Sequence, residues 1–335
     1  MTNPDLSSLI TIAHTVLQQT PQNDATPVPT GVQATNCPQV FLFHQTCAQA
    51  RQPAVYEPGL ILVLSGEKHI SLGAQVFAYD CTQGLLLTAS YPVLCTAQAS
   101  AEAPLLGLYI ALERLQVAQL LGQIRRLQGV SSVLPLADED VPLVASTAPI
   151  SAAVASTQPD HTQSLRDAQV GITAFAVTPA VQQAVAHLLA ALADPIAAAL
   201  FASERSQALL YALLNQAPVH NAVQRWLAQD GNYAQFLKAI AFIRGHLAFS
   251  LTVQAIAAQA GLSESSLNRT FKRFAQDTPL QYVKKLRLNQ AHSQLLRTRC
   301  SVQTAAYDAG YESAAQFSRD YKRYFGVNPK DAHKA

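Results

Sequence analysis

Apolar and polar positions recur with different periods along the 335-residue chain, and the changes of period predict its elements. Apolar residues between Leu6 and Leu17 fall on one helical face. Residues 21–38, rich in Pro, Thr, Asn and Gln, are typical of a loop. Short apolar or alternating runs then predict strands at residues 40–43, 60–64, 69–72, 76–79, 85–87 and 105–110. Strands at such regular spacing indicate a sandwich or a small barrel. After them, apolar residues over residues 112–127 return to helical spacing.

The pattern changes again between residues 129 and 177, where Pro, Ser, Thr, Ala and Val dominate without a sustained period. We interpret this stretch as an insertion or linker whose end, residues 170–177, can form one further strand. Helical spacing resumes over residues 181–192 and 196–215, with apolar side chains on more than one face. Two interpretations stay open for these helices, namely packing within the domain or a partner surface beyond the domain itself.

Residues 251–329 contain one pattern twice, because the eight residues from Leu267 align with the eight from Phe317. Each copy predicts a helix, a tight turn at Gly261 or Gly310, and a second helix. The second helices bury apolar stripes three and four residues apart and leave polar and basic residues outside. This is the helix-turn-helix arrangement, in which the second helix enters the major groove of DNA. The predicted caps and turn residues are Thr252, Gly261, Ser301 and Gly310.

The charge distribution strengthens the prediction of DNA binding. The net charge of +2 is the sum of a basic and an acidic part of the chain. Residues 236–335 carry 15 Lys and Arg against 6 Asp and Glu, whereas the remaining chain carries 8 Lys and Arg against 15 Asp and Glu. A basic domain supplies the cations that phosphate contacts require. The positions predicted to read base edges are Ser266, Asn268, Arg269, Ala315, Gln316 and Arg319. The positions predicted to contact phosphates are Ser265, Lys272, Arg273, Lys322 and Arg323, and Ser318 is a further polar position on the second of these helices.

At these residues the chain resembles the AraC/XylS family of bacterial transcription regulators. The matching segments include Ala260-Gly261-Leu262-Ser263, Gly310-Tyr311-Glu312-Ser313 and Phe325-Gly326-Val327-Asn328-Pro329. The resemblance implies two helix-turn-helix units joined by a long helix, together with a double-stranded DNA operator as partner and contact with RNA polymerase. In this chain the joining helix would span residues 280–297, with Thr278 as its cap and Pro279 in its first turn. The chain departs from the family pattern in having Gln276 where glycine is usual and Tyr311 where phenylalanine is commoner, and it lacks the usual terminal Tyr-Arg.

The first half also resembles one subfamily of AraC-type N-terminal domains, through residues 55–58, 62–68 and 79–80. That resemblance implies a cupin-like fold. The predicted class is therefore α+β, with an N-terminal β-barrel or cupin-like domain and a C-terminal all-α double helix-turn-helix domain. The predicted boundaries are 1–34 for a helix and loop, 35–128 for the sensor domain, 129–177 for the insertion, 178–232 for a helical linker that can dimerise, and 233–335 for the DNA-binding domain.

The rival class of function is a metal-dependent cupin enzyme, which needs closely spaced histidines and a carboxylate. The barrel region contains only His44 and His69, and no His-x-His occurs. No phosphate loop, nucleophile elbow or paired-carboxylate site appears either. The sequence therefore predicts no catalytic residue, no metal and no cofactor, and a protein that is not an enzyme.

Sensing is the remaining role for the barrel, which can hold one small-molecule effector. The residues predicted to line it are Phe41, Phe43, Tyr56, Leu62, Leu64 and Phe77. An alternative is a thiol that reacts with an oxidant or an electrophile, at Cys47, Cys81 or Cys95. A further alternative is that the barrel only supports assembly.

Sequence features also predict a location. No stretch combines the length and hydrophobicity of a membrane span, and the N-terminus lacks the regions of a signal peptide. The five cysteines show no C-x-x-C pairing. We therefore expect a cytoplasmic protein with reduced thiols and no membrane partner.

Overall fold

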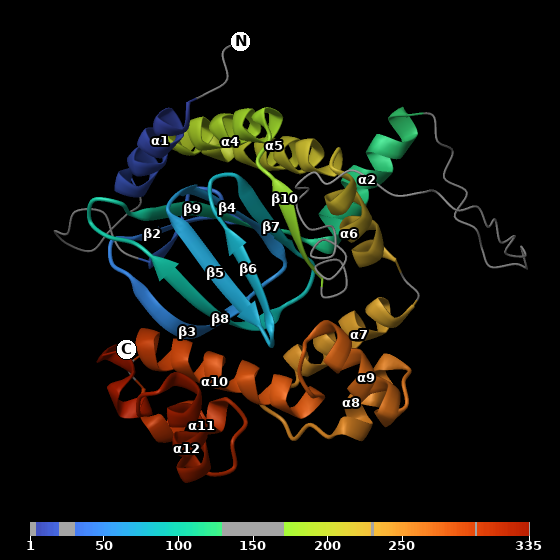
Figure 1. Ribbon diagram of the computed structural model, residues 1–335. Helices are drawn as coiled ribbons and strands as arrows, with labels where there is room; N and C mark the ends of the chain where they lie inside the picture. The colour runs from blue at the N-terminus through green and yellow to red at the C-terminus, as the bar shows by residue number, and fades with distance from the viewer. Residues whose placement is uncertain (1–4, 20–30, 129–170, 229–230, 299, 335) are drawn as a thin grey trace, which may run out of the picture.

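The computed structural model describes residues 5–19, 31–128, 171–228, 231–298 and 300–334 (Figure 1). Two antiparallel sheets form the centre of the N-terminal half. The larger has the strand order β1-β2-β9-β4-β7-β10 and the smaller has the order β3-β8-β5-β6. The strands are β1 (Gly31–Ala34), β2 (Val40–Gln45), β3 (Gln49–Tyr56), β4 (Gly59–Ser65), β5 (Glu67–Leu72), β6 (Gln75–Tyr79), β7 (Gln83–Leu87), β8 (Tyr91–Gln98), β9 (Leu105–Ala111) and β10 (Ile172–Ala176).

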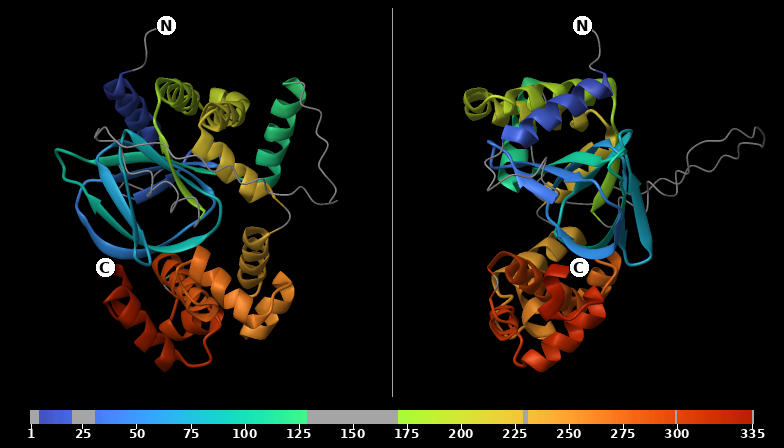
Figure 2. Two further views of the ribbon diagram at one scale, coloured as in Figure 1. Left: turned by 45° about the vertical axis from the view of Figure 1, so that its right-hand side comes forward. Right: turned by 90° about the vertical axis from the view of Figure 1, so that its left-hand side faces the viewer.

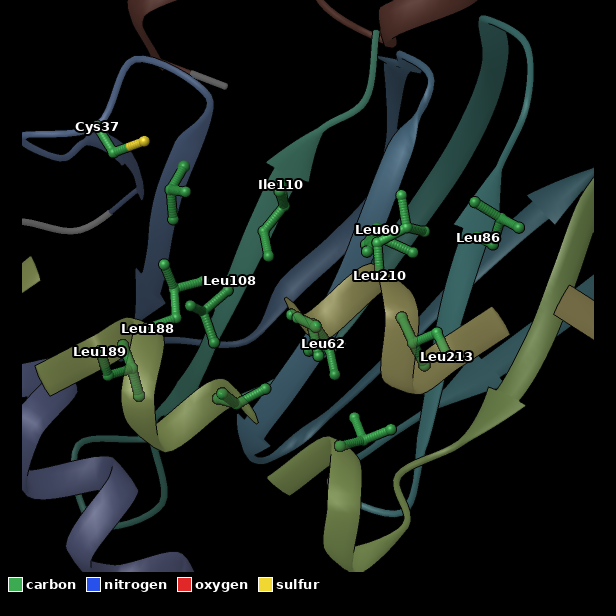
Figure 3. Packing of buried hydrophobic residues seen from close by; sticks show 14 of the residues in the cluster. Cys37, Leu60, Leu62, Leu86, Leu108, Ile110, Leu188, Leu189, Leu210 and Leu213 are labelled. Atoms are coloured by element: carbon green, nitrogen blue, oxygen red, sulfur yellow. The ribbon is translucent and has the colours of Figure 1, made fainter. Parts of the chain in front are cut away.

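Helices cover the outer face of the six-stranded sheet, as Figures 1 and 2 show. They are α1 (Leu6–Gln19), α2 (Arg114–Leu127), α4 (Pro179–Leu192), α5 (Pro195–Leu214) and α6 (Ala217–Leu227). Leu60, Leu62 and Leu64 of β4 belong to the same buried cluster as Leu188 and Leu213 of these helices (Figure 3). The alternate residues of β4, Ile61 and Val63, belong to a second cluster with residues of the four-stranded sheet, because successive side chains of a strand point to opposite faces.

The C-terminal half is helical and lies beneath the four-stranded sheet in Figure 1. Its helices are α7 (Asn232–Gly245), α8 (Val253–Ala260), α9 (Glu264–Phe274), α10 (Pro279–Thr298), α11 (Val302–Asp308) and α12 (Ala314–Phe325), followed by the 3₁₀-helix η1 (Pro329–Lys334). The duplicated pattern thus forms α8–α9 and α11–α12, with α10 as the joining helix. The predicted α+β class is confirmed.

The predicted caps of the repeat are confirmed atom by atom. The hydroxyl of Thr252 accepts a hydrogen bond from the Ala255 amide at 3.1 Å, and that of Ser301 accepts one from the Thr304 amide at 3.0 Å. The hydroxyl of Thr278 accepts one from the Gln281 amide at 3.3 Å and so begins the joining helix. Gly261 and Gly310 have φ of +66° and +80°, the left-handed conformation that glycine adopts without strain.

The strand predictions were correct at six positions and incomplete elsewhere. Strand β10 confirms the further strand expected within residues 170–177, where it pairs with β7; the rest of the predicted insertion lies outside the described residues. The predicted loop over residues 21–38 was wrong at its end, because Gly31–Ala34 form β1, which pairs with β2. Strand β3 was missed because polar residues interrupt its apolar run, and β8 was missed because Pro92 stands at its second position, where proline argues against a strand.

The two halves share one buried core instead of meeting at a polar surface. Phe236 of α7 lies at its centre, with ring centroids 5.2 Å from Phe271, 5.3 Å from Phe274 and 6.5 Å from Tyr91 of β8. Tyr233 packs edge-on against Phe274 at 5.0 Å. We call these five rings the aromatic junction. It makes the position of the helical half depend on the sheet beside it.

Candidate DNA-binding interface and effector pocket

Helices α9 and α12 each separate a buried stripe from an exposed polar face. On α9 the buried residues are Leu267, Thr270, Phe271 and Phe274, and on α12 they are Phe317, Asp320 and Tyr321. The predicted contact residues lie on the opposite faces. Those that are exposed are Ser265, Asn268, Arg269, Lys272, Arg273, Ala315, Gln316, Arg319, Lys322 and Arg323, whereas Ser266 and Ser318 are half-buried.

Some of these side chains are already engaged and others are not. Arg269 donates to the Ser266 hydroxyl at 3.2 Å, and Arg323 pairs with Asp320 at 2.6 Å. Lys272, Arg319 and Lys322 form no hydrogen bond or ion pair with any residue in the described ranges. These three cations are therefore free of partners within the described part of the protein, whereas Arg269 and Arg323 would have to leave Ser266 and Asp320 to contact DNA.

The basic residues of α10 hold the helical half together. Lys284 pairs with Asp320 of α12 at 2.7 Å, and Lys285 pairs with Asp277 at 2.6 Å. Arg287 donates to the carbonyl oxygens of Leu247 at 2.9 Å and Phe249 at 2.6 Å. Sequence reasoning had counted these charges only toward DNA binding. A signal was present, because Asp320 lies in phase with a buried stripe, where a carboxylate requires a cation.

The family departure at Gln276 has a structural counterpart. Gln276 follows α9 with φ of +56°, and Gly326, at the equivalent place after α12, has φ of +81°. Both helices thus end in the left-handed conformation. The first copy reaches it with a residue that has a Cβ, and that Cβ lies 2.6 Å from where a Cβ on Gly73 would be. The turn between β5 and β6 therefore lies against the residue that follows the C-terminal end of α9.

A pocket of about 230 Å³ lies within the N-terminal half. Its lining residues are Val32, Phe43, Val55, Tyr56, Glu57, Ile61, Lys68, Tyr79 and Tyr109. Of the six residues predicted to line the interior, Phe43 and Tyr56 do so. Phe41 instead packs its ring 5.8 Å from Tyr109, and Phe77 is buried in the core without reaching the pocket. Leu62 and Leu64 face the helices, since the inward positions of β4 are Ile61 and Val63.

Lys68 is a pocket residue that sequence reasoning did not select. It lies on β5 in the same alternation as Ile70 and Leu72, which are buried, whereas Glu67 on the other face is exposed. Its Nζ lies 5.3 Å from the ring centroid of Phe43 and 5.6 Å from that of Tyr56. Burial lowers the pKa of its ammonium group. A lysine in phase with two buried aliphatic residues was the signal in the sequence.

The candidate sensor thiols differ in their exposure. Cys95 is buried on β8, and burial raises the pKa of its thiol, so it holds less reactive thiolate than an exposed cysteine. Cys47 is exposed and Cys81 is half-buried. His44 packs its ring edge-on against His14, and His69 contacts Glu67 at 2.7 Å. Among the residues that the structure describes, no three His, Cys, Asp or Glu side chains gather as a metal site.

Glu57 connects the pocket to the helical half. It lines the pocket, and its carboxylate accepts hydrogen bonds from Arg244 of α7 and from the Ser90 hydroxyl. Arg244 also donates to that hydroxyl. Close by, the Tyr282 hydroxyl of α10 donates to the Ser90 carbonyl at 2.6 Å, and the Tyr233 and Thr88 hydroxyls are 2.5 Å apart. A polar network therefore runs from the pocket wall to α7 and α10.

Comparisons with protein families identify the class of this chain. A model described as the AraC-type transcriptional regulator N-terminus matches residues 36–220, which is more than half of the chain. A model described as a helix-turn-helix domain matches residues 256–335. The chain therefore belongs to the family of AraC-type transcriptional regulators. Across the described residues, no helix is long and apolar enough to cross a membrane.

Several curated relatives match over the C-terminal part. The HTH-type transcriptional regulator ArgR of Pseudomonas aeruginosa is 30% identical over 100 residues, which cover 30% of each chain. GbdR of the same species is 26% identical over 126 residues, covering 38% of this chain and 34% of GbdR. The HTH-type transcriptional activator RhaS of Escherichia coli is 33% identical over 92 residues, covering 28% and 33%. The matched part thus spans about a third of the length of these relatives.

A solved structure covers nearly the whole fold. The apo form of a ToxT variant from Vibrio cholerae superposes with a TM-score of 0.53 over 89% of this chain and 98% of that chain, at 8% sequence identity. Wild-type ToxT bound to an unsaturated fatty acid gives a TM-score of 0.52 over 87% and 93%, also at 8% identity. At this identity the likeness concerns the fold, namely a β-rich N-terminal half followed by a double helix-turn-helix.

Proposed function

We propose that this protein is a sequence-specific DNA-binding transcription regulator. The observation that carries the proposal is the pair of helices α9 and α12, whose exposed faces present Arg269, Lys272, Arg319 and Lys322 while α10 fixes their separation. Lys and Arg on these faces would release counterions from phosphates, and the polar residues among them would read base edges. The base-reading and phosphate-contacting roles assigned from the sequence are part of this proposal, as are contact with RNA polymerase and a cytoplasmic location.

A small effector in the 230 Å³ pocket controls the regulator in this proposal. The support is Glu57, which lines the pocket and binds Arg244 of the helical half. An occupant that moved Glu57 would change how α7, and with it the aromatic junction, holds the reading helices. Such a coupling is reciprocal, so DNA would change effector affinity by the same factor. ToxT, which shares the fold, has been solved with an unsaturated fatty acid bound.

The division of the chain at residue 233 into a sensor part and a DNA-binding part is also a proposal. The aromatic junction spans this boundary, and it therefore determines which form of the protein is used to measure DNA binding. Because Phe236 is shared between the halves, the DNA experiment uses the full chain. Binding is measured by fluorescence anisotropy against a duplex selected from a random pool and against random duplex, in about 50–200 mM salt. We expect the selected site to bind roughly 10³-fold or more tightly than random DNA.

Matched variants separate the interface from general charge. Lys272→Ala and Lys322→Ala should each lower the salt slope by about one, whereas Arg126→Ala on the exposed end of α2 should leave it unchanged. Equal affinity for selected and random duplex, or an effect of Arg126→Ala as large as that of Lys322→Ala, would contradict the proposal.

The proposal includes a homodimer through α5. Ile196, Leu200, Phe201 and Tyr211 are large apolar or aromatic residues exposed on this helix. Exposed apolar patches mark contact surfaces more often than chance. Sedimentation of the wild type and of Leu200→Glu tests the assignment, since the variant should shift the protein to a monomer, and an unchanged state would exclude this face.

A further inference from the structure

The alternation along β5 places a charged side chain where the fold otherwise places apolar ones. Lys68, Ile70 and Leu72 share one face, and Ile70 and Leu72 are almost fully buried. Lys68 is opposite Tyr79 on β6 and Ala97 on β8, and both neighbours are buried as well. Its ammonium group therefore extends into the space between the two sheets, at the wall of the 230 Å³ pocket.

The ammonium group of Lys68 lacks an anionic partner in the part of the chain that the structure describes. It lies over the faces of Phe43 and Tyr56, and it also interacts with the buried thiol of Cys95, whose pKa is raised by burial. Glu57, the carboxylate in the pocket wall, is bound to Arg244 and Ser90 instead. Desolvation works against the charge and lowers the lysine pKa. Two aromatic faces offset only part of the cost of burying a cation.

We propose that the pocket binds a small monocarboxylate, with the carboxylate paired to Lys68 and the apolar body packed against Phe43, Ile61 and Tyr109. This deepens the proposed function, because it takes the pocket as the effector site and names the class of effector. An anion is favoured because it supplies the charge that the pocket lacks. A second cation would be repelled by Lys68, and a neutral molecule would leave the ammonium group uncompensated.

The pocket volume limits the size of the occupant. At about 230 Å³ it is smaller than the roughly 300–1,000 Å³ of pockets that hold drug-sized ligands. A dry cavity of about 150 Å³ holds benzene. The pocket therefore fits an acid with one ring or a short chain. Phenylacetate and hexanoate represent the two shapes.

The test is calorimetric titration of the full, DNA-free protein with phenylacetate and hexanoate at pH 7, beside the matched neutral phenylacetamide and hexanamide. We expect at least one acid to bind at least tenfold more tightly than its amide. Lys68→Met should remove this preference, because it keeps the apolar length and removes the charge. The control is Lys238→Met, an exposed lysine of α7 beside the cleft between the halves, which should bind the acid like the wild type.

Unfolding of the ligand-free protein gives a second readout. Lys68→Met should unfold at a higher temperature than the wild type, because it removes an uncompensated charge. A lower midpoint would mean that the lysine stabilises the fold through its aromatic contacts, and the proposal would be wrong. Equal binding of acid and amide, no binding of either acid at millimolar concentration, or a loss in Lys238→Met instead would also overturn it. Because no DNA is present, these failures leave the DNA-binding proposal standing.

Discussion

The hydroxyl of Tyr282 donates a 2.6 Å hydrogen bond to the backbone carbonyl of Ser90. Tyr282 belongs to α10, which joins the two helix-turn-helix units, and Ser90 immediately precedes β8 of the four-stranded sheet. The Ser90 hydroxyl in turn contacts Glu57 and Arg244. Ser90 therefore contacts both the joining helix and the ion pair at the pocket wall. Changes at the pocket have a short path to the separation of α9 and α12.

Tyr282→Phe should weaken this attachment while keeping the ring. The hydroxyl is buried, so its loss should destabilise the protein by about 1 kcal/mol. Urea unfolding followed by tyrosine fluorescence and circular dichroism measures the change. Tyr307→Phe is the control, because Tyr307 is exposed on α11. Equal stability of the two variants would show that the bond to Ser90 contributes nothing.

Glu57→Gln should reduce communication between pocket and DNA more than it reduces stability. The pair with Arg244 is partly exposed, so its loss should cost less than about 1 kcal/mol of folding free energy. The ratio of DNA affinities with and without a bound acid should move toward one. Arg244→Gln should have the same effect, and the double variant should add little. If both variants keep the wild-type ratio, the signal travels elsewhere.

Arg269→Ala and Lys322→Ala should lower DNA affinity in different ways, the first by sequence-specific loss and the second by sequence-independent loss. Loss of a base-edge contact at Arg269 should cost on the order of 1–3 kcal/mol on the selected site and relax preference at one base pair. Loss of a phosphate contact at Lys322 should weaken all duplexes alike. Competition against singly substituted duplexes measures both. Equal losses on selected and random DNA for Arg269→Ala would overturn its role in reading bases.

Gln276→Gly should stabilise the protein by about 1 kcal/mol, because the left-handed backbone strains a residue that has a Cβ. Gly326→Ala is the matched reverse change. A Cβ at Gly326 would meet no atom within 4 Å, so backbone strain is its main cost, and we expect a similar loss. Chemical denaturation compares the two. Destabilisation by Gln276→Gly would mean that the contact with Gly73 outweighs the strain.

Stability should fall as pH rises above about 10. Burial raises the pKa of Tyr79, Tyr91 and Tyr282, whereas unfolded tyrosines ionise near 10. Above that pH the folded state holds more protons than the unfolded state, so stability decreases with pH. Lys68 has a lowered pKa in the folded state, so its titration makes stability rise with pH. This opposing contribution ends near pH 10.5, where the lysine of the unfolded chain loses its proton. Urea midpoints from pH 8 to about 11 should fall less steeply in Tyr79→Phe.

Local signals made the helical half predictable. Caps such as Thr252, turn glycines such as Gly310 and the three-and-four spacing around Phe271 act within a few residues, so the sequence displays them directly. The inward face of β4 was hidden, because helices cover the outside of its sheet and make both of its faces apolar. On β5 a single lysine among aliphatic residues marks the inward face, but Lys68 was not selected, because the pocket beside it depends on strands far apart in the sequence.

The aromatic junction also determines the order in which the chain can complete its core during synthesis. Tyr91 of β8 is made early, but its neighbour Phe236 and the helices around it belong to the last hundred residues. At a synthesis rate of about 5–20 residues per second, roughly ten seconds pass between the synthesis of β8 and that of the helices that cover it. During that interval Tyr91 and the apolar residues beside it face water or a chaperone. A nascent chain that stops before α7 would carry this uncovered surface permanently.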